Sequence, residues 1–148
     1  MLLLLVALLA ATLFTGAALY ITLVEHPARL SLAEGPMLTQ WQQSYRRALP
    51  IQSMLALVAG LGALGAGWVS GSGLAVAGGV AMLANWPFTL AALLPINRRL
   101  SPAMAGAGDG HSHQLLLRWG RLHDVRSLLG VAGVLLLLGA FLHAMPAS

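Results

Sequence analysis

The sequence has no cysteine and no lysine among its 148 residues. Without cysteine, disulfides, thiolate metal ligands and cysteine nucleophiles are all excluded. Charged side chains make up only 8% of the chain and hydrophobic ones 58%, whereas a soluble globular domain carries about 25% charged residues. A chain of this length cannot hide so much apolar surface from water, because small domains keep a large surface for their volume. The sequence therefore predicts an integral membrane protein whose main contact is the lipid bilayer.

The eight basic residues are all arginines, and with four acidic residues they give a net charge of +4. They flank apolar segments, so membrane topology explains them better than a nucleic-acid partner does, and we expect no nucleic-acid binding.

Four apolar segments are long enough to cross a bilayer, which needs about 20 helical residues. They cover residues 2–24, 48–70, 74–94 and 127–145. The stretch 71–73, Gly-Ser-Gly, is typical of a tight turn between helices. The first segment lacks a basic region before it and a clear cleavage site after it, so we expect a retained helix rather than a signal peptide. We predict one all-α domain, a four-helix transmembrane bundle with polar loops at 25–47 and 95–126.

Arginine occurs only in the two polar loops. Three arginines fall within 25–47 and five within 95–126, while the termini and the Gly-Ser-Gly turn hold none. By the positive-inside rule, both loops would face the cytoplasm and both termini the opposite side. The absence of lysine and the abundance of Ala, Gly, Leu and Arg suggest a bacterial genome rich in GC. We therefore expect a multi-pass protein of the bacterial cytoplasmic (inner) membrane.

Two patterns in the sequence have simpler explanations than a binding site. Residues 60–65, GLGALG, have the spacing of a dinucleotide-binding turn, but they lie inside an apolar span. Their glycines are better suited to close helix packing, which would also allow a homo-oligomer whose copy number the sequence does not determine. His111 and His113 stand in a glycine-rich loop, where we interpret them as incidental rather than as metal ligands.

A set of polar and aromatic side chains lies near the four helix ends that share the cytoplasmic face in this topology. They are Glu25 and His26; Tyr45, Arg46 and Gln52; Trp86 and Asn97; and Trp119, His123 and Arg126. Ionisable groups at this depth are costly unless they are paired or functional, and bundle cores often hold cofactor sites. We predict a polar pocket here, with Glu25 paired to Arg126 or Arg46. Pro87 and Pro95 would interrupt the third helix beside it.

Four motifs stand in order along the chain: EHP at 25–27, WP at 86–87, PINRRL at 95–100 and WGRLHDVR at 119–126. Together they resemble the anthrone oxygenase-like family of small four-helix membrane proteins. The resemblance covers nearly the whole chain, and the stretch GAGDGHSHQ departs from it most.

Fungal members of that family oxidise anthrones to anthraquinones. The resemblance implies an O2-dependent oxidation of a hydrophobic aromatic molecule that arrives from the bilayer. It leaves the cofactor open between none beyond O2 and haem or copper. It implies a catalytic set of His123, Arg126, Glu25, His26 and Asn97, and a substrate-binding set of Tyr45, Trp86, Trp119, Arg46 and Gln52. His123 would remove a proton, Arg126 would stabilise the enolate oxygen, and Glu25 or His26 would relay the proton.

Two alternatives remain open at the level of the sequence. In one, His26 and His123 are ligands to haem iron or copper in a membrane redox protein. In the other, the chain is a structural or binding component of the membrane, whose polar cluster only holds the bundle together. The first alternative predicts a coloured or metal-containing protein, and the second predicts that His123→Ala lowers stability alone.

Overall fold

The computed structural model describes residues 1–101 and 111–145, which form four long helical stretches without any strand. The first stretch is α1 (Leu2–Tyr20), the π-helical segment η1 (Ile21–Glu25) and α2 (His26–Leu30); the second is α3 (Glu34–Ser70); the third is α4 (Gly73–Phe88), the π-helical segment η2 (Thr89–Leu93) and α5 (Leu94–Leu100); the fourth is α6 (His111–His143). Each stretch is long and apolar enough to cross a membrane. This confirms the predicted all-α, four-helix architecture.

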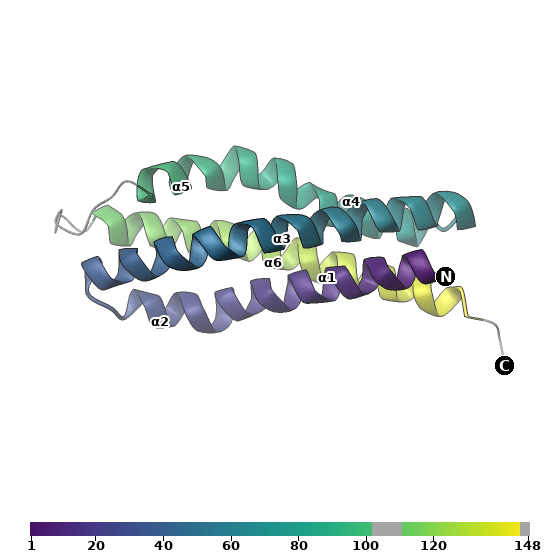
Figure 1. Ribbon diagram of the computed structural model, residues 1–148, viewed down its shortest axis with the longest axis horizontal. Helices are drawn as coiled ribbons and strands as arrows, with labels where there is room; N and C mark the ends of the chain where they lie inside the picture. The colour runs from purple at the N-terminus through teal and green to yellow at the C-terminus, as the bar shows by residue number, and fades with distance from the viewer. Residues whose placement is uncertain (102–110, 146–148) are drawn as a thin grey trace.

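Successive stretches run antiparallel, and the start of α1 and the end of α6 lie at the end of the bundle opposite α2 and α5 (Figure 1). α1 packs against α3 and α6, and α4 packs against the same two helices, so the ring of helices is closed. Small residues let the backbones approach: a Cβ on Gly79 would lie 2.9 Å from the carbonyl oxygen of Gly60. Large apolar side chains point outward instead, including Leu61 and Trp68, which is 89% exposed. Small side chains inside and large ones outside suit a bundle in lipid.

A residue in the left-handed backbone conformation makes the turn between α3 and α4. Gly71 has a φ of +69°, a conformation that glycine adopts without steric cost. The Ser72 side chain then caps α4 by accepting a hydrogen bond from the Ala75 backbone N–H at 3.3 Å. The predicted tight turn at 71–73 is confirmed.

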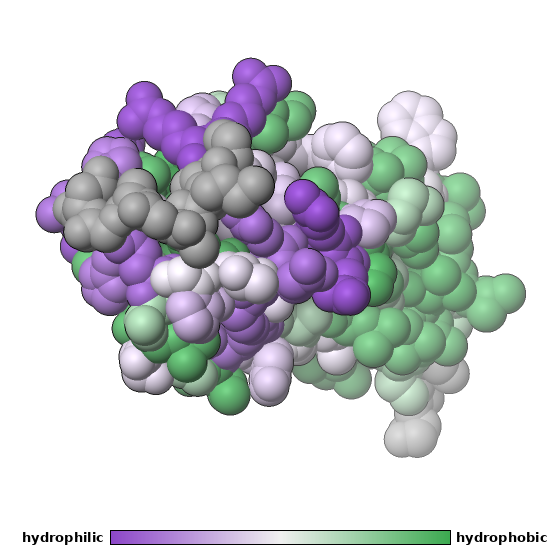
Figure 2. All heavy atoms as spheres, turned by 60° about the vertical axis from the view of Figure 1, so that its left-hand side comes forward, coloured by the Kyte–Doolittle hydropathy of each residue, from purple (hydrophilic) through white to green (hydrophobic). Residues whose placement is uncertain are grey.

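The stretches that we expected to be polar loops are largely helical in the part of the chain that the structure describes. α3 begins at Glu34 and α6 at His111, so both helices extend well beyond their apolar spans. The extensions have their own core, built from Met37, Leu38, Trp41, Leu93, Ile96, Leu100, Leu115, Leu116 and Trp119. Because these apolar residues recur at helical spacing, they continue the bundle past the apolar spans. Figure 2 shows hydrophilic side chains gathered on this end, which carries α2 and α5, and hydrophobic ones covering the rest of the visible face.

Proline widens two of the helices without ending them. Pro27 and Pro95 each stand two residues after a π-helical segment, η1 or η2. A proline lacks an N–H donor and its ring crowds the carbonyl four residues earlier, and a wider turn relieves both effects. The third stretch is interrupted as an α-helix between Pro87 and Pro95, where η2 stands, but the chain remains helical through both prolines.

Candidate functional site

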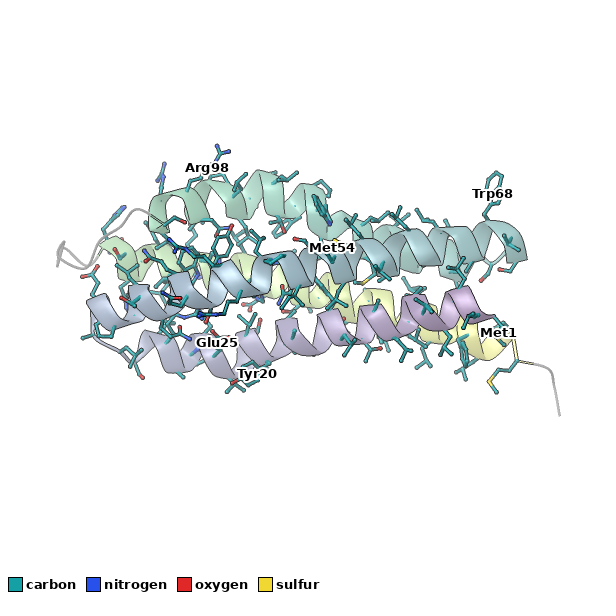
Figure 3. All side chains as sticks on the ribbon, viewed as in Figure 1. Met1, Tyr20, Glu25, Met54, Trp68 and Arg98 are labelled. Carbon is teal, nitrogen blue, oxygen red and sulfur yellow. The ribbon has the colours of Figure 1, made fainter. Side chains whose placement is uncertain are left out.

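An interior cavity lies at the polar end of the bundle, where both π-helical segments face it. Its walls are Ile21, Glu25 and Arg29 from the first stretch; Trp41, Ser44, Tyr45, Ala48, Leu49 and Gln52 from α3; Thr89, Leu93 and Asn97 from the third stretch; and Trp119, His123 and Arg126 from α6. The cavity has a volume of about 40 Å³, enough for a few water-sized molecules. In Figure 3, Glu25 lies in this half of the bundle and Trp68 projects outward at the other end.

Glu25 is the acceptor at the centre of a partly buried hydrogen-bond network. Its Oε1 accepts from Arg29 Nη2 at 2.5 Å, from Ser44 Oγ at 2.5 Å and from Gln40 Nε2 at 2.9 Å. Arg29 Nε also donates to Gln40 Oε1, so the three side chains are mutually linked. Arg29 is only 2% exposed, and within residues 1–101 and 111–145 this is the one ion pair.

The expected pairing of Glu25 with Arg126 or Arg46 is therefore wrong. The helix continues through Pro27, which places Arg29 one turn beyond Glu25 on the same face. The polar loop expected at 25–47 includes both residues, and in a loop their spacing predicts no contact.

Arg126 is instead a cation without a carboxylate partner among the residues that the structure describes. Its Nη2 donates to Gln52 Oε1 at 3.1 Å, and its guanidinium carbon lies 5.4 Å from the centre of the Phe14 ring. The Nε of Arg126 and the Nε2 of Gln52 are buried without a hydrogen-bond partner. A guanidinium with unused donors beside a cavity is suited to bind an oxygen that carries negative charge.

His123 is held between an aromatic ring and a hydroxyl. It is 2% exposed, its ring stacks on Trp119 with centroids 4.9 Å apart, and its Nδ1 lies 3.2 Å from Thr22 Oγ1. Trp119 is itself anchored, because its Nε1 donates to Asn97 Oδ1 at 2.9 Å. The side chain of Arg29 also covers the indole, with Cζ 5.8 Å from the ring centre. The base candidate thus has little rotational freedom.

The structure brings most of the predicted site residues to this cavity and places three elsewhere. Glu25, Tyr45, Gln52, Asn97, Trp119, His123 and Arg126 line the cavity. His26 does not line it; its ring contacts Trp119 at 5.4 Å and its Nδ1 is buried without a partner. Trp86 and Arg46 line two neighbouring surface grooves. His111 and His113 begin α6 and do not line the cavity.

The groove that contains Trp86 lies beside the cavity and shares part of its lining. It lies between α3 and the α4–η2 stretch, has a volume of about 220 Å³ and is lined by Tyr45, Leu49, Ser53, Trp86, Thr89, Leu90, Leu94 and Arg126. Tyr45, Leu49, Thr89 and Arg126 line the cavity as well. Its opening faces the outside of the bundle, where Leu90 and Trp86 are exposed. An apolar groove therefore leads from the lipid-facing surface to Arg126.

Sequence reasoning missed Arg29, Trp41 and Thr22. The spacing of Glu25 and Arg29 could have revealed their pairing. Likewise, Trp41 and Tyr45 are four residues apart and stack at 5.0 Å with nearly parallel rings. Thr22 stands inside an apolar run, and no local pattern indicates that it meets α6.

The donor set for a metal is small. No group of three or more His, Cys, Asp or Glu side chains gathers anywhere in residues 1–101 and 111–145. The two histidines of the metal hypothesis, His26 and His123, both have their rings against Trp119. Within the described residues, a metal here would therefore have those two imidazoles as its only ligands of these kinds.

Comparison with known proteins identifies the family. A model of the anthrone oxygenase family matches residues 41–136, more than half of the chain. The chain belongs to the anthrone oxygenase family. The matched stretch includes His123 and Arg126 and begins after Glu25 and Arg29. No curated protein and no solved structure matches the sequence.

Proposed function

We propose that this member of the anthrone oxygenase family uses O2 to oxidise a hydrophobic aromatic carbon acid of the anthrone kind. The observation that carries the proposal is the position of Arg126. This cation has no carboxylate partner among the described residues, and it lies where a lipid-facing groove meets the cavity that contains His123. The Arg126 guanidinium could stabilise negative charge that develops on a substrate oxygen there.

The two spaces suit two reactants of different size. The groove, at about 220 Å³, offers Trp86 and Tyr45 as aromatic surfaces for a flat ring system from the bilayer. The cavity, at about 40 Å³, is suited to O2 or water and not to fused rings. In this proposal the aromatic molecule lies in the groove, its carbonyl oxygen near Arg126 and its reactive carbon toward His123.

The reaction needs a base, an oxyanion partner and O2. His123 takes a proton from the CH2 group, and the electron pair left on the carbon spreads onto the carbonyl oxygen, which Arg126 stabilises. The carbanion then transfers its electrons to O2 and a C–O bond forms, which gives a peroxide on the substrate. Loss of the second C–H proton breaks the O–O bond and releases hydroxide. In sum, the CH2 group and O2 give C=O and water, so the carbon loses four electrons and O2 gains four.

The surface charge supports an orientation in the membrane. Arg46, Arg47, Arg98 and Arg99 are exposed on the parts of α3 and α5 near the cavity, and the described residues at the opposite end, where α1 begins and α6 ends, include no arginine. By the positive-inside rule we place the cavity end at the cytoplasmic face of a bacterial inner membrane.

The test is O2 uptake and quinone formation by purified protein with an anthrone, against the spontaneous reaction without protein. We expect His123→Gln to lower kcat about 10²–10⁴-fold and Arg126→Gln about 10²–10³-fold. The matched controls are His143→Gln and Arg121→Gln, two exposed side chains on the same helix, which should keep the wild-type rate. A wild-type rate equal to the spontaneous one would contradict the proposal.

A second measurement separates the metal hypothesis from this one. We expect the purified protein to show no Soret band and no stoichiometric iron or copper. A band or a metal that both His26→Ala and His123→Ala remove would make the histidines ligands and would refute the cofactor-free scheme.

A further inference from the structure

We propose that Thr22 is a positioning residue that holds His123 in the Nδ1–H tautomer and leaves the Nε2 lone pair free to accept a proton. The catalytic meaning of this inference rests on the proposed function, but the tautomer is a property of the protein without substrate. Thr22 lies in the π-helical segment η1 and is half-buried against α6.

The Thr22 hydroxyl departs from the usual behaviour of a hydroxyl in a helix. Serine and threonine side chains in helices commonly donate to the carbonyl oxygen one turn earlier. Thr12, Thr39 and Ser70 do so here, at 2.8, 3.0 and 2.8 Å. Thr22 directs its Oγ1 across to the neighbouring helix instead, 3.2 Å from His123 Nδ1 and 3.0 Å from Ser127 Oγ.

A third contact closes this chain of hydrogen bonds. Ser127 Oγ lies 3.4 Å from the backbone oxygen of His123, one turn earlier on α6. A carbonyl oxygen can only accept, so Ser127 must donate its single proton to it. Thr22 must then donate its own proton to Ser127 Oγ. The remaining contact, between Thr22 Oγ1 and His123 Nδ1, can form only if Nδ1 carries a proton and donates it.

The other tautomer satisfies fewer contacts. If His123 carried its proton on Nε2, Thr22 would have to donate to Nδ1, and Ser127 would have to donate to Thr22. The bond from Ser127 to the His123 carbonyl would then be lost. The geometry therefore favours Nδ1–H, in which the base lone pair is on Nε2 of a ring that lines the cavity. Trp119 stacks on the same ring, at an interplanar angle of 25°, and keeps it in this orientation.

The experiment is ¹⁵N NMR of full-length protein labelled at histidine, in detergent micelles or nanodiscs, over a pH series without substrate. The chain has five histidines, and the signals that disappear in His123→Gln identify those of His123. We expect a neutral His123 ring with Nδ1 protonated and Nε2 unprotonated. A ring with Nε2–H, or one that is doubly protonated throughout the series, would refute the inference.

Three variants test the role of the hydroxyl chain. Thr22→Val keeps the side-chain shape but removes both contacts, so the Nδ1–H population should fall. Thr22→Ser keeps the hydroxyl and should preserve the wild-type spectrum. Ser127→Ala removes the acceptor for the Thr22 hydroxyl. That hydroxyl can then donate its hydrogen bond to Nδ1 of His123 instead, so the population with a proton on Nε2 should rise. An unchanged His123 spectrum in Thr22→Val would show that Thr22 does not set the tautomer. If Thr22→Val does not fold, the wild-type and Ser127→Ala spectra still test which tautomer His123 adopts and whether the hydroxyl chain sets it.

Kinetics then connect the tautomer to the reaction. We expect Thr22→Val to lower kcat about tenfold, less than the roughly 10²–10⁴-fold effect of losing the base itself, with Thr22→Ser near the wild-type rate. If no variant and no wild-type protein consumes O2 with an anthrone while the NMR signature is as expected, the proposed function fails and the tautomer assignment stands. If the wild type is active and Thr22→Val retains its full rate, Thr22 has no positioning role in catalysis.

Discussion

The ion pair between Glu25 and Arg29 offers a sharp test of how the polar end of the bundle is stabilised. Arg29 is 2% exposed and the side chain of Glu25 is 18% exposed, so solvent screens neither charge strongly. Removing one member of such a pair leaves the other charge buried, which typically costs about 3–5 kcal/mol. Arg29→Met should lie near the lower end of that range, because Gln40 and Ser44 still donate to Glu25.

The double variant Glu25→Gln/Arg29→Met separates the energy of the ion pair from the cost of leaving one buried charge without its partner. In Glu25→Gln the Arg29 guanidinium loses the one carboxylate that pairs with it among the described residues and keeps Gln40 as an acceptor, so we expect a loss of about 3–5 kcal/mol. Combining Glu25→Gln with Arg29→Met removes both charges. Its cost should therefore fall short of the sum of the single costs by about 2–3 kcal/mol.

The assay is the free energy of unfolding, measured by titrating SDS into the protein in detergent micelles and following helical circular dichroism. Arg99→Met is the matched control, because Arg99 is exposed at the same end of the bundle. It should change the free energy of unfolding by about 0.5 kcal/mol or less. In combination with Glu25→Gln, the two changes in free energy should add. If the costs of Glu25→Gln and Arg29→Met also add simply, the two charges do not stabilise one another and the reasoning is wrong.

Two further predictions concern packing and topology. Gly120→Ala should cost about 1–3 kcal/mol, because a Cβ there would overlap the His26 ring. Adding His26→Ala should recover part of that loss in the same SDS titration, while Gly16→Ala, which has open space, should not destabilise. The cysteine-free chain also allows a direct test of orientation. In spheroplasts, a membrane-impermeant maleimide should label Ser70→Cys and leave Ser31→Cys unlabelled, whereas the reverse pattern would invert the proposed topology.

The properties that could be predicted from the sequence are those that depend on local composition. An uncharged apolar run of membrane length forms a helix whatever its neighbours are, since lipid offers no other partner for its backbone. For this reason the four helical stretches and the turn at 71–73 follow from the sequence alone. The grouping of polar residues at one end also follows, because antiparallel helices of equal length bring alternate ends together.

The end of the first helix is where local reasoning gave the wrong result. Polar residues at 25 and 26 followed by Pro27 predict a helix end, but the helix continues to Leu30. The π-helical segment η1 before Pro27, like η2 before Pro95, absorbs the crowding by the proline ring. The helices therefore continue, and the residues beyond Pro27 gain a helical register that places Arg29 beside Glu25.

Only the tertiary structure decided which side chains meet across helices. Arg126 has Gln52 as its partner and not Glu25, Trp86 borders the groove and not the cavity, and Thr22 meets His123 from 101 positions away in the sequence. The helical period determines which face a residue occupies, but the partner on that face depends on the rotation and axial shift of the neighbouring helix. Those are set by the close approach of small residues in the other half of the bundle and by the extra width of each π turn. The sequence by itself therefore determined the membrane bundle and the end that holds its polar residues, while the packing of the four helices decided how those residues form a site.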